Sequence, residues 1–341
     1  MPKNNFASIE SIINVAKKGG MFILVDDEKR ENEGDLIIST SNSNAKNINF
    51  MAKYGRGLIC LALDSVQAKR LNLTLMSANN QSRNKTAFTV SIEAKKGITT
   101  GISARDRAKT ISIASKKNVK KTDIVSPGHV FPIIAKDGGV LVRAGHTEAS
   151  VDISKLAKKN NSAVICEIMN EDGTMARLPE CQELAKKFDL KVVSIADLIE
   201  YRLQNETLIE QTIETEINTA FGSFKAIAFR QLTNDMEHLA LVKGEWNEED
   251  EVPIRVHSSH LIGDVFQLLD IGKGPKLHAA MQRVEKILHI FNIVTIKKCS
   301  QSISNDFASC SVHLIQFVYI INRQTNGYFS GWVSCLYVRH I

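Results

Sequence analysis

Residues 21–39 read MFILVDDEKRENEGDLIIS and place an acidic loop between two apolar runs. Residues 21–25 predict a short buried strand, and residues 36–39 predict a second one. Six carboxylates lie in the ten residues between them. They repel one another unless a cation or a base compensates, and dense oxygen ligands suit Mg²⁺. A solvated run of charges is the alternative, and the loop by itself leaves both interpretations open.

The sequence around this loop mixes helix and strand signals without a regular βαβ alternation. Ser8 is expected to cap a helix that ends at Gly19-Gly20 and whose apolar face carries Ile9, Ile12, Ile13 and Ala16. Further strands are predicted at 57–63, 88–93, 163–169 and 190–194, and further helices at 152–160, 179–188 and 194–202. This mixture favours an α+β fold over a doubly wound sheet.

The length of 341 residues is comfortable for two domains. Residues 204–218 are polar and rich in Glu and Thr, which is typical of a linker. We therefore expect a first domain at 1–203, a linker at 204–218, a second domain at 219–288 and an unassigned tail at 289–341.

Composition argues against nucleic-acid-binding and membrane proteins. The net charge is +6, but the Lys residues are scattered in pairs, and only 6% of residues are aromatic. The N-terminus lacks an apolar signal core, and the longest apolar stretch, around 314–321, is too short to span a bilayer. The six cysteines form no Cys-x-x-Cys pair, which fits reduced thiols. We expect a soluble, cytoplasmic protein that binds neither nucleic acid nor membrane.

A second candidate site is RAGHTE at residues 143–148. Gly145 would let the backbone turn so that Arg143, His146 and Thr147 point to one place. Arg offers a planar fork for phosphate, Thr adds a hydroxyl donor, and His can ligate a metal or transfer a proton near neutral pH. A turn with an incidental His is the alternative.

Two more residues are candidates for acid–base chemistry. His129 lies in SPGHVFP (126–132), where two prolines and Gly128 would hold the backbone rigid, although a purely structural turn competes with this reading. Glu167 lies in the apolar run VICEI (164–168), where burial would raise its pKa. A Glu on the solvent face of that strand is the alternative.

Five stretches together resemble the 3,4-dihydroxy-2-butanone-4-phosphate synthase family. They are VDDEKRENEGDLI (25–37), GITTGISARDRAKT (97–110), SPGHVFPI (126–133), AGHTEASVDI (144–153) and CEIMNEDGTMARLPEC (166–181), and the similarity spans roughly residues 6–203. It implies a layered mixed β-sheet with helices. It also implies a lyase of riboflavin biosynthesis, which converts D-ribulose 5-phosphate to L-3,4-dihydroxy-2-butanone 4-phosphate and formate by enolisation, dehydration, a carbon shift and loss of C4.

The same resemblance implies roles for individual residues. Glu31 and His146 would ligate Mg²⁺ or Mn²⁺, with two ions per site and no organic cofactor. His129 and Glu167 would be the essential acid–base groups. The ribulose 5-phosphate site would comprise Arg30, Glu31, Asp35, Arg143, Ala144, Gly145, His146, Thr147 and Glu167. Residues 99–103 would also line it. The family is typically a homodimer with active sites at the subunit interface.

Residues 219–286 resemble GTP cyclohydrolase II in FGSFKAIAFR (221–230), EHLALVKG (237–244), RVHSSHLIGDVF (255–266) and GPKLHAA (274–280). That family binds zinc through three cysteines, and the corresponding positions here hold His260, Ile271 and Lys273. Ile cannot ligate zinc and Lys is a poor ligand. We therefore expect a smaller, degenerate and truncated α/β domain without zinc.

Three functions compete. The chain could be the synthase alone, a bifunctional enzyme with residual GTP cyclohydrolase II activity, or a non-catalytic protein that uses a metal–phosphate pocket for assembly. The missing zinc ligands argue against the second. The presence of both His129 and Glu167 argues against the third, because a binding module does not need both proton-transfer groups. We expect the first.

Overall fold

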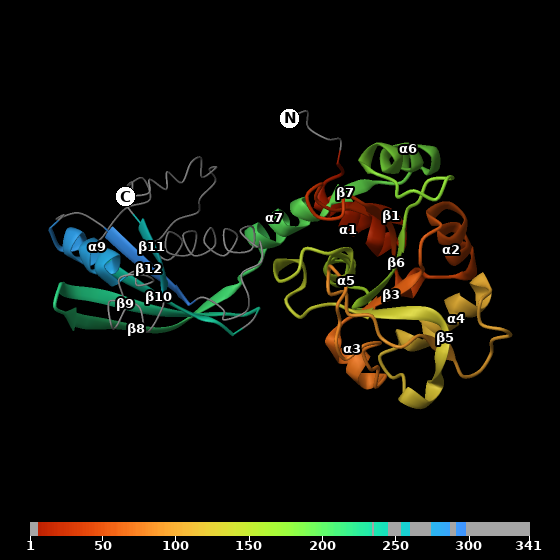
Figure 1. Ribbon diagram of the computed structural model, residues 1–341, viewed down its shortest axis with the longest axis horizontal. Coiled ribbons are helices and arrows are strands. Elements are labelled where there is room, and N and C mark those ends of the chain that lie inside the picture. The colour runs from red at the N-terminus through yellow and green to blue at the C-terminus, as the bar shows by residue number, and fades with distance from the viewer. Residues whose placement is uncertain (1–5, 234, 245–253, 260–273, 287–290, 298–341) are drawn as a thin grey trace. The chain divides into compact units, whose positions relative to one another are not determined.

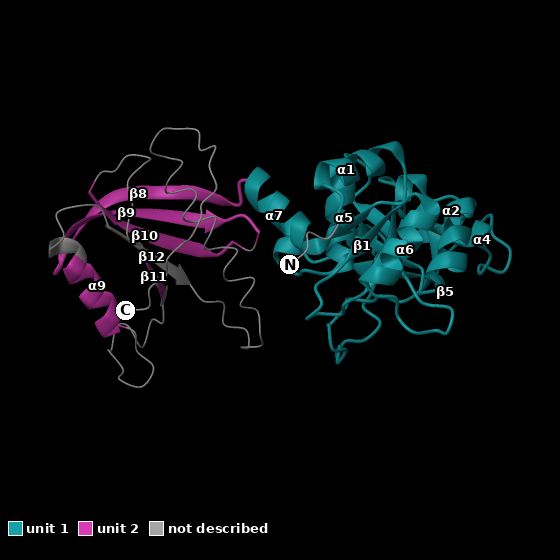
Figure 2. Cartoon of the chain, turned by 90° about the horizontal axis from the view of Figure 1, so that it is seen from above, with its two compact units in different colours: residues 1–206 teal, residues 207–341 magenta. Residues whose placement is uncertain are grey.

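The chain folds into two compact units, Met1–Glu206 and Thr207–Ile341, each with its own β-sheet (Figures 1 and 2). The structure, a computed structural model, describes residues 6–233, 235–244, 254–259, 274–286 and 291–297. None of the helices in these ranges combines the length and apolar character that crossing a bilayer requires.

The first unit is built on a mixed seven-stranded sheet in the order β4-β5-β3-β6-β2-β1-β7. The strands are β1 (Phe22–Val25), β2 (Gly34–Ser39), β3 (Cys60–Leu63), β4 (Ile92–Ala94), β5 (Ile124–Ile134), β6 (Ser162–Glu167) and β7 (Val192–Ser194). The β1–β7 and β3–β5 pairs are parallel, and the other neighbours are antiparallel. This mixed sheet with helices confirms the α+β prediction.

Helices cover both faces of this sheet (Figure 1). Ile23 and Val25 pack in one apolar cluster with residues of α2 (Ala45–Phe50), α4 (Ala104–Ala114) and α6 (Leu178–Phe188). Phe22 and Leu24 are equally buried and, because side chains alternate along a strand, they face the opposite side. On that side lie α1 (Ile9–Lys18), α5 (His146–Leu156) and α7 (Ile195–Asn205). The short α3 (Ser65–Arg70) follows β3.

The predicted first helix is confirmed in detail. Ser8 Oγ accepts a hydrogen bond from the Ser11 amide at 3.3 Å, and Gly19 ends the helix with a φ of 81°. Ile9, Ile12, Ile13 and Ala16 are the buried face. The local pattern was sufficient here because the cap, the apolar stripe and the terminal glycine all agree.

Other boundaries differ from the sequence predictions. The strand expected at 88–93 is β4, which spans Ile92–Ala94. The helix expected at 152–160 is α5, which begins earlier, at His146, and ends at Leu156. Residues 126–132, whose prolines and glycine suggested a rigid segment with a structural turn as the alternative, belong to the long strand β5. The prolines argue against a strand because they lack a backbone N–H. Nevertheless β5 pairs with β3 and β4 on either side, and sheet pairing overrides local propensity.

The second unit holds a five-stranded sheet in the order β11-β12-β10-β9-β8. Its elements are β8 (Ile209–Thr219), β9 (Gly222–Gln231), β10 (Glu237–Lys243), β11 (Ile254–Ser259), α9 (Gly274–Lys286) and β12 (Phe291–Lys297). Strand β8 occupies most of the segment predicted to be a linker, and β12 lies in the segment predicted to be an unassigned tail. The linker prediction failed because β8 is an edge strand with mostly exposed side chains, and its polar composition resembles that of a linker.

Candidate functional site

The acidic loop between β1 and β2 is organised around one buried carboxylate, Asp26. Its side chain is 1% exposed. Its Oδ2 accepts from Arg30 Nη1 at 2.7 Å and from the Glu31 amide at 3.2 Å, and its Oδ1 accepts from the Glu33 amide at 2.9 Å. Arg177 Nη1 donates to the carbonyls of Glu31 and Asn32 from outside the loop. The loop is therefore an ordered turn, not a solvated run of charges.

The predicted metal ligands Glu31 and His146 lie together at the inner side of this loop. His146 Nδ1 lies 3.7 Å from Glu31 Oε2, and His146 Nε2 lies 3.9 Å from Asp35 Oδ1 on β2. Burial disfavours a charged His146, but Asp35 and Glu31 outweigh it and raise its pKa to about 9. The nearby His146 ring lowers the pKa of Glu31 to about 2, assisted by Arg30.

Glu167 and Asp35 are paired on neighbouring strands, β6 and β2. Glu167 Oε2 accepts from the Leu58 amide at 2.8 Å, and a Cβ at position 57 would lie 2.6 Å from this oxygen, so Gly57 permits the contact. Burial raises the pKa of Glu167, and burial together with Glu167 raises the pKa of Asp35 to about 7. This pair can therefore hold or release protons near neutral pH.

Arg143 forms the other wall of the site. Its Nη1 donates to Glu148 Oε2 at 2.6 Å, and its Nη2 donates to the Asn84 carbonyl and to Thr86 Oγ1, both at 3.1 Å. A Cβ at Gly145 would lie 2.8 Å from Glu148 Oε2. The Asn84 side chain contacts Glu31, so Asn84 connects the Arg143 wall to the acidic loop.

The cluster has the composition of a divalent-cation site. Asp26, Glu31 and His146 place ligand atoms within 4.8 Å of one another. His146 Nε2 is buried and has no hydrogen-bond partner among the described residues, which is costly unless a ligand satisfies it. Carboxylate oxygens with one imidazole suit Mg²⁺ or Mn²⁺, so the residues fit such an ion.

His129 lies apart from this cluster. It is on β5, which is separated from Glu167 on β6 by strand β3. Neighbouring strands lie about 4.8 Å apart, so two strand spacings are about 10 Å. The ring of His129 is 44% exposed, and its Nδ1 contacts Glu93 on β4. The structure thus brings Arg30, Glu31, Asp35, His146 and Glu167 together, connects Arg143 to them and leaves His129 outside.

His146 and Thr147 directly follow Gly145. They are the first residues of α5, and both are buried. Ala144 precedes Gly145 and is exposed. The sequence indicated a turn here because the helix buries polar side chains, including Glu148, Ser150 and Asp152, and so lacks a clean apolar stripe.

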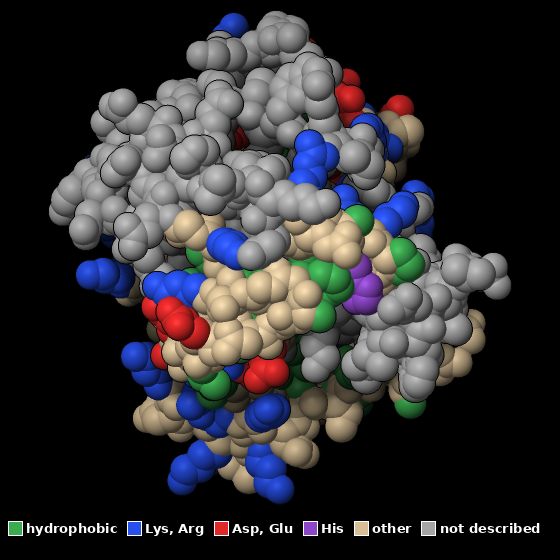
Figure 3. All heavy atoms as spheres, turned by 90° about the vertical axis from the view of Figure 1, so that its left-hand side faces the viewer, with side chains coloured by type: hydrophobic (Ala, Val, Ile, Leu, Met, Phe, Trp, Pro, Cys, Tyr) green, Lys and Arg blue, Asp and Glu red, His purple; other side chains and the backbone are tan. Residues whose placement is uncertain are grey.

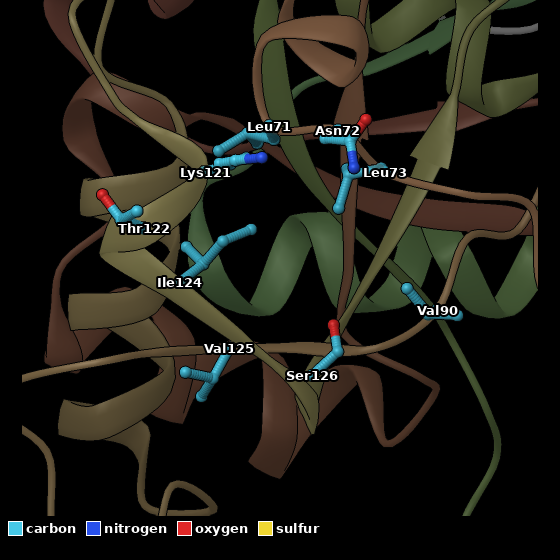
Figure 4. Close-up of a pocket in the computed structure, with 9 residues that line it drawn as sticks. All are labelled: Leu71, Asn72, Leu73, Val90, Lys121, Thr122, Ile124, Val125 and Ser126. Atoms are coloured by element: carbon cyan, nitrogen blue, oxygen red, sulfur yellow. The ribbon is translucent and has the colours of Figure 1, made fainter.

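Sequence reasoning missed four residues that shape the site: Asn84, Glu148, Arg177 and, as the organiser of the loop, Asp26. Glu148 could have been suspected from its place in RAGHTE, but nothing local to Asn84 or Arg177 signals their contacts. An open pocket of about 300 Å³ lies at the start of β5, lined by residues that include Leu71, Leu73, Val90 and Val125 (Figure 4). None of the predicted site residues lines it.

The face of the molecule drawn in Figure 3 carries charges of both signs. Lys, Arg, Asp and Glu side chains all appear among its coloured residues.

Comparison with known proteins gives consistent matches over both units. The family model for 3,4-dihydroxy-2-butanone 4-phosphate synthase matches residues 10–201, and that for GTP cyclohydrolase II matches residues 210–290. The riboflavin biosynthesis protein RibBA of Aquifex aeolicus is 49% identical over 283 residues, covering 82% of this chain and 70% of that protein. RibBA of Bacillus cereus (strain B4264) is 48% identical over 281 residues, with the same coverage of both chains.

Solved structures show the same similarity. RibBX, a two-domain 3,4-dihydroxy-2-butanone 4-phosphate synthase from A. baumannii, superposes with a TM-score of 0.78 at 39% identity, covering 94% of this chain and 91% of that one. A 3,4-dihydroxy-2-butanone 4-phosphate synthase in complex with two magnesium ions has a TM-score of 0.57 at 37% identity, covering 59% of this chain and 98% of that one.

Proposed function

The chain belongs to the 3,4-dihydroxy-2-butanone 4-phosphate synthase family, and on that premise we propose that the cluster around Glu31 and His146 is its active site. The enzyme is a lyase of riboflavin biosynthesis. The observation that carries the assignment is the convergence of Glu31, Asp35, His146 and Glu167 from three separate segments. Ionisable groups that gather at one place and have shifted pKa values are typical of active sites.

We assign the phosphate of ribulose 5-phosphate to the Arg143 wall. The guanidinium is held in a fixed orientation by Glu148, Asn84 and Thr86, and its planar fork of donors suits an anion such as phosphate. Thr147 and the first amides of α5 follow Arg143 closely along the chain, and a helix N-terminus favours negative charge. Binding of phosphate here would orient the sugar carbons toward Glu31 and Glu167.

Proton transfer is assigned to Glu167 with Asp35. Enolisation removes a proton beside the sugar carbonyl, so a base must be able to accept it and later return it. Burial raises the pKa of both carboxyls, and that of Asp35 lies at about 7. The pair can therefore take up a proton at neutral pH without an additional cofactor.

The divalent cation would be held by Glu31 and His146, with Asp26 and Arg177 keeping the loop in shape. When bound, it would stabilise negative charge that develops on the substrate oxygens. The relative that was solved with two magnesium ions supports Mg²⁺, and the same ligands accept Mn²⁺. Two ions per site is part of this proposal.

We further propose that the enzyme is a homodimer in which His129 of the partner subunit completes each site as a further acid–base group. His129 is exposed and lies outside the cluster of its own chain. Several large apolar side chains of the first unit are also exposed, among them Leu75, Met76, Ile102 and Val125, and a dimer interface would cover such residues.

Subunit mixing tests this arrangement. Glu31→Gln and His129→Asn homodimers should both be inactive, whereas random mixing should restore about a quarter of the parent activity, because half of the dimers then hold one intact site. Activity that stays absent in the mixture, with dimers confirmed by sedimentation, would place His129 and Glu31 in the same subunit's site.

For the second unit we propose a role other than GTP ring opening. The zinc positions hold His260, Ile271 and Lys273, which lie outside the described residues, so the argument rests on their chemistry alone. Elemental analysis of zinc-reloaded protein should find no stoichiometric zinc. One tightly held zinc per chain, together with GTP turnover, would support the bifunctional alternative.

Glu31→Gln tests the active site directly. The variant keeps the side-chain shape and removes the ligand charge, so formate release from ribulose 5-phosphate in Mg²⁺ should fall at least about 100-fold. Glu28→Gln is the matched control, because Glu28 is an exposed carboxylate of the same loop and its loss should leave the rate unchanged. A Glu31→Gln enzyme as active as Glu28→Gln would refute the assignment.

A further inference from the structure

We propose that Glu93 is a positioning residue that fixes the orientation and tautomer of His129, a role that rests on the proposed function of His129 as an acid–base group. The two side chains come from neighbouring strands, β4 and β5, and the Glu93 carboxylate contacts His129 Nδ1. The carboxylate is 17% exposed and the imidazole is 44% exposed. The orienting group is thus largely covered while the oriented ring remains accessible.

An irregularity in the β4–β5 ladder creates this pair. Ile92 lies opposite Val130, but the next residue, Glu93, lies opposite Val125. Residues 126–129 of β5 therefore have no opposite residue on β4 and bulge out of the ladder. Bulges re-aim side chains and often lie next to active sites. Here the bulge brings His129 back toward the Glu93 carboxylate.

Two glycines leave the space that the pair occupies. Gly101 has a φ of +92°, and a Cβ at this position would overlap the Glu93 carboxylate and lie 2.7 Å from His129 Nδ1. A Cβ at Gly128 would overlap the backbone of Ile92 and the Glu93 side chain. At both glycines the backbone packs directly against Glu93 or His129. A larger residue at either position would therefore displace these side chains.

The loop that covers the pair is itself held in place. Asp106 Oδ2, on α4, accepts from the Thr99 amide at 3.1 Å, from Thr99 Oγ1 at 2.6 Å and from the Gly101 amide at 3.1 Å. Asp106 is buried, and Ser103 caps the same helix by accepting from the Asp106 amide. The contact between Gly101 and the pair is therefore anchored to a helix.

The chemical consequence concerns which nitrogen of His129 carries a proton. A carboxylate at Nδ1 favours the tautomer with hydrogen on Nδ1, so that Nε2 is free to accept a proton from substrate. The same carboxylate stabilises the imidazolium that forms when Nε2 takes that proton. Glu93 would act on the reaction only through His129 and would not touch the substrate.

The test combines kinetics with the tautomer of His129. Glu93→Ala should lower kcat for formate release by about 100-fold, within the usual contribution of acid–base groups, with KM changed by less than about threefold. In ¹⁵N-resolved NMR spectra the His129 ring should change from the Nδ1–H form to the Nε2–H form. Glu93→Gln, which keeps a carbonyl oxygen as acceptor, should recover much of kcat and the parent tautomer.

Gly101→Ala provides a second route to the same pair, and Gly97→Ala is its matched control. Both glycines have positive φ, but a Cβ at Gly97 meets only Lys109 Cε at 3.4 Å. Both variants suffer the same kind of backbone strain, and only Gly101→Ala should lower kcat and disturb the His129 resonance.

Each outcome has one meaning. Parent kcat or an unchanged tautomer in a folded Glu93→Ala enzyme would overturn the positioning role. His129→Gln is measured in parallel. If His129→Gln is fully active, the proposed role of His129 fails, and the NMR comparison still decides independently whether Glu93 orients the ring.

Discussion

Glu31 and His146 depend on each other for their charge. His146 lowers the pKa of Glu31 to about 2, and Glu31 helps Asp35 to raise the pKa of His146 to about 9. At neutral pH in the metal-free protein this is an imidazolium among carboxylates. A divalent cation requires the neutral imidazole and therefore competes with that proton.

This competition predicts a pH-dependent stability for the metal-free protein. A folded-state pKa above the ordinary value of 6.5 gives stability that is complete below about pH 6.5 and is lost as pH rises through about 9. The free energy of unfolding in EDTA should fall over this window, by at most about 1.4 kcal/mol per pH unit. Urea unfolding at several pH values measures it.

His146→Gln is the comparison variant, and its stability should change less over the same window. The stabilisation that Mg²⁺ adds to the parent should grow with pH, because fewer protons then compete for the ring. Parallel pH profiles for the parent and the variant would show that His146 does not have the raised pKa.

Among the elements, α7 supports the site indirectly, through the segment that precedes Arg143. Arg202, in its last turn, donates to the Gly138 carbonyl at 3.0 Å and to Asp152 Oδ2 on α5 at 2.6 Å, and it binds Glu206 through two nitrogens. Asp152 also accepts from the Val140 amide at 2.8 Å. These bonds fix residues 138–142, the segment that delivers Arg143 to the site.

Arg202→Met should therefore destabilise the first unit strongly. The change leaves the buried Asp152 carboxylate, which is 5% exposed, without its cation, and breaking a buried pair in this way costs about 3–5 kcal/mol. Thermal and urea unfolding provide the measurement. Glu171→Gln breaks an ion pair whose carboxylate is 93% exposed and should change stability by less than about 1 kcal/mol. Equal effects of the two variants would contradict a stabilising role for the Arg202–Asp152 ion pair.

In the whole molecule, the two units differ in what they contribute. Every residue assigned to catalysis lies between Asp26 and Glu167, within the first unit. RibBX, the two-domain synthase, matches 94% of this chain, which shows that a second domain accompanies the synthase in other proteins as well. The sheet of the second unit extends beyond the expected domain at 219–288, because β8 begins at Ile209 and β12 ends at Lys297.

A chain ending at Glu206 should fold, dimerise and keep most of the formate-releasing activity. It retains the sheet, the site and the bidentate partner of Arg202. A chain ending at Gln204, where the polar segment alone suggests a cut, loses Glu206 and should melt at a lower temperature. Sedimentation, specific activity and thermal unfolding of both fragments decide the question. An insoluble or monomeric and inactive 1–206 fragment would give the second unit a scaffolding role.

Much of the fold and of the site could be predicted wherever the signal is local. The capped first helix, the two strands around the acidic loop and the strand with Glu167 follow from periodicity and turn residues. The motifs that contain Glu31, His129, His146 and Glu167 identified the family before any geometry was known. These signals lie within short stretches, so neighbouring residues along the chain are sufficient to interpret them.

The remaining features depend on residues that are distant in sequence. Strand β5 forms despite its prolines because β3 and β4 pair with it, and polar β8 is a strand because β9 supplies its hydrogen bonds. Asn84 and Arg177 reach the acidic loop from 53 and 146 positions away, and Glu93 reaches His129 across a bulge. Hydrogen-bond partners and the burial that shifts a pKa exist only after the chain has folded, so no local pattern encodes them.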